Sequence, residues 1–246
     1  MREWLYGRNA VLETLRSQRR EFYRLWVAQG AQDKGRLEEI IQEAHKLKLP
    51  IEKVNRSQLE KFGKGHQGTA LEVSGYPYLA VADMLDLADQ KGEMPFLLIL
   101  DTLQDPQNLG SLLRTAETVG VHGVILPLRR TATVTAAVVN ASSGASEHLL
   151  IAQANLAQAI VQLKEAGLWV IGLEGSPKGQ EIDQIRLDGP LALVVGSEGE
   201  GMRRLVSDSC DVLLRLPMRG KIESLNAAVA GSVALYFVWQ RRGFKH

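Results

Sequence analysis

The chain has 246 residues, of which 45% are hydrophobic, and its formal net charge is +1. This length fits one large α/β domain or two of ordinary size, and the patterns below favour two. No run approaches the roughly 18 apolar residues of a membrane span, and the first residues lack an apolar signal core. The single cysteine, Cys210, excludes a disulfide framework and a zinc site built from thiolates. We therefore predict a cytoplasmic protein in which Cys210 is buried.

The charge is distributed unevenly along the chain. Residues 1–64 hold 14 Lys or Arg and 9 Asp or Glu, giving +5, whereas residues 65–246 hold 15 and 19, giving −4. A basic segment of this kind is typical of a surface that binds a polyanion. The same charges also fit a solvated helical face, and composition alone does not separate the two interpretations.

Residues 1–76 are predicted to form a small unit of alternating helices and strands. Apolar residues recur at helical spacing from Tyr6 to about Arg19, and Asn9 is the expected cap of this helix. Two further helices are expected over residues 37–44 and 57–63. Short apolar runs predict strands over residues 22–30, 51–54 and 65–76, the last entered through a glycine-rich turn.

Residues 77–94 are predicted to be a linker that contains a helix around Met84, and residues 95–246 to be a second domain. Helices are expected after Asp105 and from about Ser224 to Arg242. Six near-continuous apolar runs predict strands: FLLILD, VHGVILP, HLLIA, LWVIGLE, LALVVGS and DVLLRLP. Strands that are apolar on both sides indicate a buried, largely parallel sheet with helices on both faces.

Several common sites lack their motifs in this sequence. The glycines from Gly196 to Gly201 are spaced G-x-x-G-x-G, which differs from the dinucleotide fingerprint, and no phosphate-loop G-K-[ST] follows. No G-x-S-x-G elbow of a serine hydrolase occurs. A zinc site is disfavoured because the histidines are scattered: His45, His66, His122, His148 and His246.

Three separated blocks place polar residues and glycines where an apolar strand is followed by a helix, which is where α/β sheets build their sites. In DPQNLGSLLRTAETVG, from Asp105 to Gly120, Gly110 and Arg114 share a helix face, so a polyanionic backbone could approach the guanidinium there. Asn108 is placed at or before the first helical turn. A helix cap for Asn108 and a surface salt bridge for Arg114 remain equally open.

The second block, VVGSEGEGM, has glycines that allow a tight turn with exposed N–H groups, and Glu198 at its centre could meet Arg114 or a ligand hydroxyl. In the third, LPMRGKIESLNAAVAGSVALY, Ser224 or Asn226 opens the last helix. Ordinary caps and a structural turn with exposed acids also fit these residues. A helix amino end also suits an anionic group.

Together the blocks resemble the signature of the SpoU/TrmH branch of the SPOUT RNA methyltransferases, namely D-P-x-N-x-G-x-x-x-R, G-S-E-G-x-G and P-M-x-G followed by S-L-N. The match spans about residues 95–240. The segments Y-G-x-N-A-V-x-E and H-Q-G resemble the small RNA-binding domain, with a ribosomal-protein-like fold, that precedes the catalytic domain in bacterial 23S rRNA guanosine 2′-O-methyltransferases. The chain departs from the pattern at Ser111, where alanine is usual, and at Ala228, where serine is common.

The resemblance implies an α/β domain with a deep trefoil knot, which general rules of chain topology would not predict. It also implies a homodimer whose subunits share their active sites, and S-adenosylmethionine as cofactor, with neither a metal nor a membrane as partner. The cofactor would be held by Gly196, Gly201, Leu216, Met218 and Leu225. Catalysis would rest on Arg114, supported by Asn108, Glu198, Ser224 and Asn226.

The implied reaction moves a methyl group to a ribose 2′-hydroxyl of RNA, which must be deprotonated or polarised as it attacks. An arginine is effectively always protonated, so two roles of Arg114 stay open: a base with a strongly depressed pKa, or a cation that stabilises the alkoxide while a substrate phosphate takes the proton. Asn108 and Asn226 would position the ribose, and Ser224 would orient the ribose or Glu198.

The expected substrate is a guanosine of 23S rRNA. The amino-terminal domain is predicted to contact RNA with the H-Q-G turn near the substrate and through Arg8, Arg16, Arg19, Arg20 and Arg24. Three alternatives remain: a tRNA 2′-O-methyltransferase of the same family, a non-catalytic RNA-binding protein of ribosome assembly, and a nucleotide-binding α/β enzyme. A non-catalytic RNA-binding protein would not need Asn108, Arg114, Glu198 and Asn226 together. A nucleotide-binding enzyme should show a phosphate-binding motif, which this sequence lacks.

Overall fold

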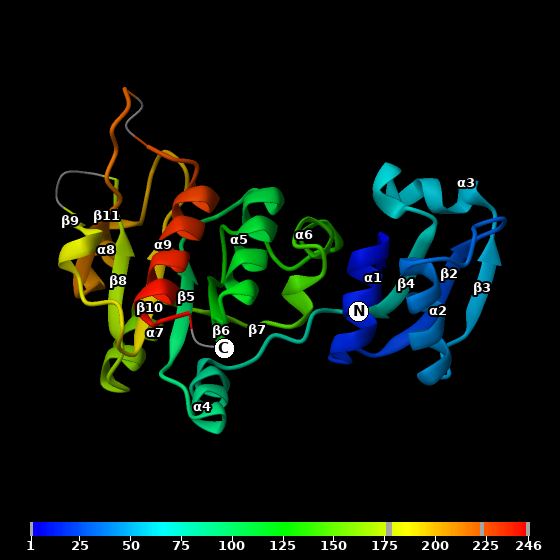
Figure 1. The fold of residues 1–246 in the computed structure, drawn as a ribbon, viewed down its shortest axis with the longest axis horizontal. Helices are drawn as coiled ribbons and strands as arrows, with labels where there is room; N and C mark the ends of the chain where they lie inside the picture. The colour runs from blue at the N-terminus through cyan, green and yellow to red at the C-terminus, as the bar shows by residue number, and fades with distance from the viewer. Residues whose placement is uncertain (1, 176–178, 222–223, 245–246) are drawn as a thin grey trace. The chain divides into compact units, whose positions relative to one another are not determined.

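The computed structural model describes residues 2–175, 179–221 and 224–244, and it divides into two compact units (Figure 1). The amino-terminal unit consists of Met1–Pro77 together with Thr133–His148. The carboxy-terminal unit consists of Tyr78–Ala132 and Leu149–His246. Each unit is therefore built from two separate stretches of the chain.

The amino-terminal unit has a four-stranded sheet in the order β1 (Arg2–Tyr6), β4 (Thr69–Ser74), β2 (Phe22–Ala28) and β3 (Ile51–Val54). Only the pair β2–β3 is parallel. The helices are α1 (Arg8–Ser17), α2 (Arg36–Lys46), α3 (Arg56–Leu59) and α6 (Ala136–Ala141), with 3-10 turns η1 (Glu60–Phe62), η2 (Lys64–His66) and η3 (Ala145–Glu147).

Two details of this unit correct the sequence predictions. Residues 2–6 form strand β1, where the sequence interpretation had only the approach to a helix. The N-cap of α1 is Gly7, with φ of 89°, so Asn9 lies inside the helix and does not cap it. A side chain at Gly7 would need a backbone conformation that residues other than glycine seldom adopt.

Arg20 and Glu147 form a buried ion pair that joins the two stretches of the amino-terminal unit. Nε and Nη2 of Arg20 each donate to a carboxylate oxygen of Glu147 at 2.7 Å, and both side chains are 0% exposed. Arg20 also donates to Glu3 and to the backbone oxygen of Ser74. Burial alone would lower the pKa of Arg20, but the two carboxylates raise it above its usual value.

Glu147→Gln should destabilise this unit by about 3–5 kcal/mol, because it leaves a buried guanidinium without its main counter-charge. Urea unfolding is followed by tryptophan fluorescence, to which Trp4 and Trp26 of this unit contribute. The control is Glu43→Gln, which breaks the surface pair with Lys46 and should cost under about 1 kcal/mol. If both substitutions lower the free energy of unfolding equally, the buried pair contributes no more to stability than a surface pair.

The carboxy-terminal unit has seven parallel strands in the order β7-β6-β5-β10-β8-β11-β9. The strands are β5 (Phe96–Leu100), β6 (Gly123–Pro127), β7 (Leu150–Ala154), β8 (Trp169–Leu173), β9 (Gln180–Glu181), β10 (Leu191–Val195) and β11 (Val212–Arg215). The helices are α4 (Val81–Lys91), α5 (Pro106–Thr118), α7 (Leu156–Glu165), α8 (Arg204–Ser209) and α9 (Ala227–Arg241), and η4 covers Ile182–Gln184. The predicted parallel α/β sheet is confirmed, whereas α8 and the short β9 were not predicted.

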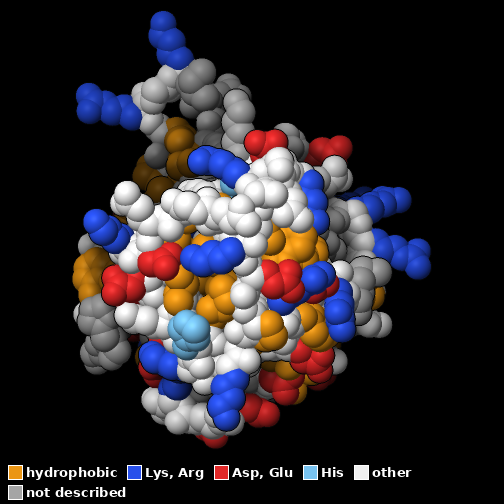
Figure 2. Space-filling view, turned by 90° about the vertical axis from the view of Figure 1, so that its right-hand side faces the viewer, with side chains coloured by type: hydrophobic (Ala, Val, Ile, Leu, Met, Phe, Trp, Pro, Cys, Tyr) orange, Lys and Arg blue, Asp and Glu red, His pale blue; other side chains and the backbone are white. Residues whose placement is uncertain are grey.

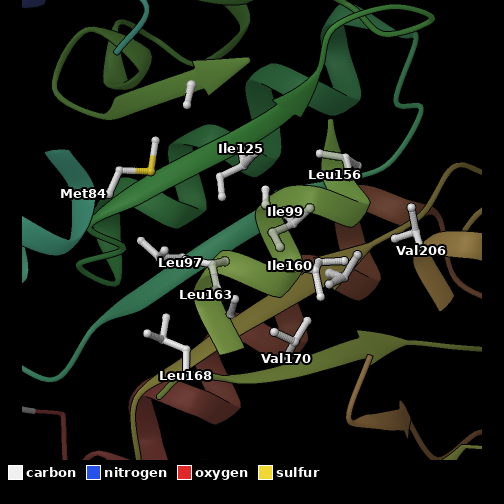
Figure 3. Close-up of a cluster of buried hydrophobic side chains, with 14 of the residues drawn as sticks. Met84, Leu97, Ile99, Ile125, Leu156, Ile160, Leu163, Leu168, Val170 and Val206 are labelled. Atoms are coloured by element: carbon white, nitrogen blue, oxygen red, sulfur yellow. The ribbon is translucent and has the colours of Figure 1, made fainter. Parts of the chain in front are cut away.

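Alternate residues of the central strands face opposite helix layers, which is why these strands are apolar throughout. On one face, Leu97, Ile99 and Val170 pack with residues of α4, α7 and α8 (Figure 3). On the other face, Val195 lies beside Gly231 of α9, and α9 packs along α5. Helices on both faces, as predicted, are confirmed.

No helix in the described part of the chain is both long enough and apolar enough to span a membrane. Cys210 is only partly buried, a correction to the expectation of full burial. Burial nevertheless raises the pKa of its thiol to about 12, so the side chain is neutral at physiological pH.

Candidate functional site

The three polar blocks follow the carboxyl ends of β5, β10 and β11. These strands belong to one parallel sheet, in which β5 pairs with β10, β10 with β8, and β8 with β11. Parallel strands end at the same edge, so the loops after them can converge there although the blocks are far apart in sequence.

The first block forms α5, which begins at a well-defined cap. The carboxylate of Asp105 accepts hydrogen bonds from the backbone N–H groups of Gln107, at 3.1 Å, and Asn108, at 3.3 Å. Pro106 occupies the first helical position, where its missing N–H costs nothing. Asn108 therefore lies in the first turn, and the cap that sequence analysis considered for Asn108 is made by Asp105.

The second block forms a tight turn after β10. The backbone groups of Ser197 and Gly201 bond to each other in both directions, at 3.0 and 3.1 Å. Gly199 and Gly201 have φ of 83° and 68°, which favour glycine. A Cβ on Gly196 would lie 2.2 Å from the carbonyl carbon of Gly201, so no larger residue fits without moving the turn.

Asn226 connects all three blocks through its side-chain amide. Its Oδ1 accepts from the N–H groups of Ala228, at 3.0 Å, and Val229, at 3.1 Å, and so caps α9. This leaves Nδ2 to point away from the helix, where it donates to Glu198 and, at 3.1 Å, to Oδ1 of Asn108. Four partners use every donor and acceptor of the amide, so its orientation is fixed.

A cavity of about 960 Å³ opens beside this trio, a size at the upper end of the range for small-molecule sites. Its walls include Glu198, Ser224 and Asn226, three of the predicted catalytic residues. They also include all five residues predicted to hold a cofactor: Gly196, Gly201, Leu216, Met218 and Leu225. Met218 and Leu225 are 42% and 41% exposed, so they offer apolar surface to a ligand.

Arg114 belongs to the first block but is not bonded to Asn226 as Asn108 and Glu198 are. It is exposed on α5, six residues after Asn108, and is not among the described residues that line the cavity. Its backbone carbonyl accepts a hydrogen bond from the Thr118 hydroxyl. The structure thus brings together four of the five predicted catalytic residues.

Sequence analysis missed two ion pairs that follow or belong to strands of this sheet. The fully buried Asp101, directly after β5, accepts hydrogen bonds at 2.8 Å from both the backbone N–H and Nε of Arg203, which fixes the end of the glycine turn. Arg215 and Glu181 form an ion pair in the cavity wall. Nε of Arg215 is buried and has no hydrogen-bond partner in the described part of the chain. The available signal was a charge within or directly after an apolar strand, in FLLILD and VLLRLP.

The arginines predicted to contact RNA do not form one cluster. Arg8 lines a cavity of about 480 Å³ beside Gln67 of the H-Q-G turn, whereas Arg19 and Arg20 lie at a different cavity of the same unit. Arg16 pairs with Glu13 and Glu39 on the helix surface. The side chain of Arg20 is fully buried, so it is removed from the set that an RNA could reach.

Comparison with known proteins gives two family matches along the chain. Residues 95–236 match the model of the SpoU rRNA methylase family, and residues 4–79 match the model of the RNA 2′-O ribose methyltransferase substrate-binding domain. A TrmH family tRNA/rRNA methyltransferase of Bacillus subtilis is 45% identical over 244 residues, which is 98% of this chain and 96% of the relative. One from Staphylococcus haemolyticus is 40% identical over 240 residues, or 97% and 95% of the two chains.

Two solved structures have the same fold. The SpoU methyltransferase AviRb from Streptomyces viridochromogenes, in complex with AdoMet, has a TM-score of 0.83 at 18% identity and covers 100% of this chain and 92% of its own. The AdoMet-bound rRNA methyltransferase from Sinorhizobium meliloti has a TM-score of 0.80 at 22% identity, with coverage of 100% and 88%. Taken with the sequence relatives and the geometry above, these matches show that the chain belongs to the SpoU rRNA methylase family and is an RNA methyltransferase.

Proposed function

We propose that this enzyme transfers the methyl group of S-adenosylmethionine to a ribose 2′-hydroxyl of RNA. The observation that carries the proposal is the trio of Asn108, Glu198 and Asn226 at a cavity bounded by the glycine turn. A methyl transfer needs a cofactor pocket and polar groups that hold a hydroxyl beside it. A non-catalytic RNA-binding protein would not need this arrangement.

The cavity fits the cofactor in shape and chemistry. The missing side chain of Gly196 leaves room for the close turn of backbone, whose N–H and carbonyl groups suit the polar edges of an adenosine. The buried Nε of Arg215 supplies an unsatisfied donor in the same wall. Apolar contact would come from Leu216, Met218 and Leu225. When bound, S-adenosylmethionine supplies an electrophilic methyl group on its sulfonium.

In this mechanism Asn108 and Asn226 hold the ribose, and Glu198 keeps the amide of Asn226 in place. Ser224, in the same wall, orients the ribose or Glu198. Arg114 stabilises the negative charge that develops on the 2′-oxygen, and a substrate phosphate accepts the proton. Arg114 does not act as the base, because its guanidinium is already protonated and is too weak an acid to lose that proton.

Arg114 is proposed to act on the site of a second copy of the chain, in a homodimer that shares its active sites. The support is that Arg114 is exposed and is not among the described residues that line the cavity of its own protomer. Val229 and Tyr236 of α9, 48% and 44% exposed, offer an apolar surface for the partner. The trefoil knot stays a prediction of the family resemblance.

Asn226 provides a test that separates folding from catalysis. Asn226→Asp keeps the acceptor that caps α9, so the helix cap should be retained. It loses both donated hydrogen bonds and repels Glu198, so methyl transfer should fall about 100-fold. Asn226→Ala should additionally lose about 1 kcal/mol of stability. Thermal unfolding and methyl-transfer rates check both variants, and full activity of Asn226→Asp would contradict the positioning role.

We propose a guanosine of 23S rRNA as the target and tRNA as the second candidate, because the relatives named above are called tRNA/rRNA methyltransferases. The substrate-binding unit, proposed as residues 1–76 with a linker over 77–94 before the catalytic domain at 95–246, would dock the RNA. Its contacts would come from Arg8, Arg16, Arg19 and Arg24. Ribosomal RNA and tRNA are cytoplasmic in bacteria, so the enzyme is proposed to act there.

The target can be identified by mapping 2′-O-methyl groups in rRNA and tRNA from cells with and without the protein. A site in 23S rRNA that disappears with the protein supports the first candidate. If a methylated site is lost only from tRNA, tRNA is the substrate in place of 23S rRNA. Unchanged methylation in both RNAs would contradict the proposed function.

A further inference from the structure

One face of the amino-terminal sheet carries a cluster of aromatic rings. Trp4 and Tyr6 come from β1, Trp26 from β2 and Phe62 from η1. The rings of Trp4 and Trp26 lie 4.4 Å apart, although β4 runs between their strands. They can meet because the residue of β4 that pairs with Trp26 is the small, fully buried Ala70.

The four rings are only half-buried, so part of each remains accessible to solvent. Their inner sides pack on the buried residues Ala28, Val54, Leu59 and Ala70. The distances from Phe62 to Trp4 and Tyr6, 5.6 and 5.9 Å, continue the cluster onto η1. Rings anchored in this way form a rigid surface on which flat groups can stack with little loss of side-chain entropy.

Two cations lie over these rings. Nζ of Lys61 is 4.6 Å from the ring centre of Trp26 and 4.9 Å from that of Phe62. The guanidinium of Arg24 is 5.4 Å from each tryptophan, but Glu52 and Glu72 neutralise it. Lys61 has no acidic partner within the described ranges, so its charge is available to an anion.

A basic cavity adjoins the aromatic cluster. The lining of the cavity of about 480 Å³ includes Arg8, Arg56 and Gln67. It also includes Ala28 of the apolar layer beneath the rings and Ala31, which packs against that layer. Nε of Arg8 donates to the backbone oxygen of Gln67 at 3.2 Å, which holds that side chain at the cavity. Aromatic surface and positive charge therefore lie close together. Figure 2 shows one face on which hydrophobic patches are mixed with both basic and acidic side chains.

We infer that this face binds unpaired nucleotides of the RNA, with bases stacked on Trp4 and Trp26 and phosphates held by Lys61, Arg8 and Arg56. Bases of a duplex are stacked on one another and offer no free faces, whereas those of loops can be splayed onto aromatic side chains. The inference rests on the proposed function, since it takes RNA as the substrate. Beyond that function, it specifies unpaired RNA as the bound form and the aromatic face as its binding surface.

The test measures binding of the full chain to a fluorescein-labelled single-stranded oligo(U) and to an RNA duplex with the same number of phosphates. Trp26→Leu should weaken binding of the single strand at least about fivefold, and Lys61→Glu about as much. The matched controls are Trp169→Leu, at a 53% exposed tryptophan of β8, and Lys34→Glu, the same charge change in a loop of the same unit. Both controls should stay within about twofold of the wild type.

Lys61→Glu keeps the test valid even if Trp26→Leu unfolds the unit, because Lys61 is exposed. Equal binding of duplex and single strand, or equal effects of Lys61→Glu and Lys34→Glu, would overturn the inference. Methyl transfer to RNA and calorimetric binding of S-adenosylmethionine are measured on the same samples. If methyl transfer and cofactor binding are intact but Trp26→Leu and Lys61→Glu do not weaken oligonucleotide binding, the inference fails and the proposed function stands. If the wild type neither transfers methyl groups to RNA nor binds S-adenosylmethionine, the proposed function itself is contradicted.

Discussion

Arg114→Ala should reduce methyl transfer by a factor of about 100 to 1,000 and leave binding of S-adenosylmethionine unchanged. Removing one preorganised group that stabilises a developing oxyanion typically costs this much. The cofactor affinity should not change, because the proposed contact of Arg114 is the ribose 2′-oxygen and Arg114 is not among the described residues that line the cavity. Initial rates with saturating RNA and calorimetric titration of the cofactor provide the two measurements.

Arg204→Ala is the matched control for Arg114. Arg204 lies in the same unit, is 95% exposed and pairs with Asp208 one turn along α8. Its removal should change the rate less than twofold. If Arg114→Ala keeps most of its turnover, the role of Arg114 in stabilising the 2′-oxygen is wrong.

If Arg114 works across a homodimer, mixing two inactive variants should restore activity. A heterodimer of Arg114→Ala and Asn226→Asp contains one site with both defects and one with neither. Mixed samples should therefore recover up to about half of the wild-type rate per heterodimer. Recovery would fail if Arg114 served the site of its own chain.

Gly196→Ala should weaken S-adenosylmethionine binding at least about tenfold, equivalent to ~1.4 kcal/mol. The added methyl group would lie 2.2 Å from the carbonyl carbon of Gly201 and 2.3 Å from the backbone nitrogen of Met202. Backbone atoms cannot rotate aside as a flexible side chain can, so the turn that bounds the cavity must move. Calorimetry measures the affinity directly.

Gly189→Ala is the control for a glycine-to-alanine change, since a Cβ there meets no atom within 4 Å. Its cofactor affinity should equal that of the wild type. If Gly196→Ala also binds the cofactor normally, the glycine turn is not part of the cofactor pocket.

The sequence predicted the parallel sheet well because burial leaves a strong local signal. FLLIL and LALVV are apolar at every position, since each strand has helices on both faces. Strand β1 lacks this signal: Leu5 is buried on one side, while Trp4 and Tyr6 are half-exposed on the other, and five residues are too few to show the alternation clearly.

The role of Arg20 could not be predicted because its partner, Glu147, is 127 residues away. A basic residue near the start of the chain contributes equally to a charge count whether it faces RNA or closes a buried ion pair. The inclusion of residues 133–148 in the amino-terminal unit could not be predicted either, because it depends on contacts between segments far apart in the sequence.

The candidate site could be predicted in part. Glycines and polar residues after apolar strands pointed to the loops, and the converging edge of a parallel sheet explains why they meet. The hydrogen bonds of Asn226 could not be foreseen, because an asparagine at a helix start is fully explained as a cap. Asp101 was visible only as an acid after an apolar run, and its bonds to Arg203 need the fold.

The most direct test of the central claim is to locate the transferred methyl group. RNA is incubated with the enzyme and methyl-labelled S-adenosylmethionine and then hydrolysed with alkali, which cleaves only next to a free 2′-hydroxyl. Transfer to the ribose predicts that the label appears in an alkali-resistant dinucleotide. Label recovered on a base in an ordinary mononucleotide, or no transfer by an enzyme that binds the cofactor, would contradict the proposed reaction.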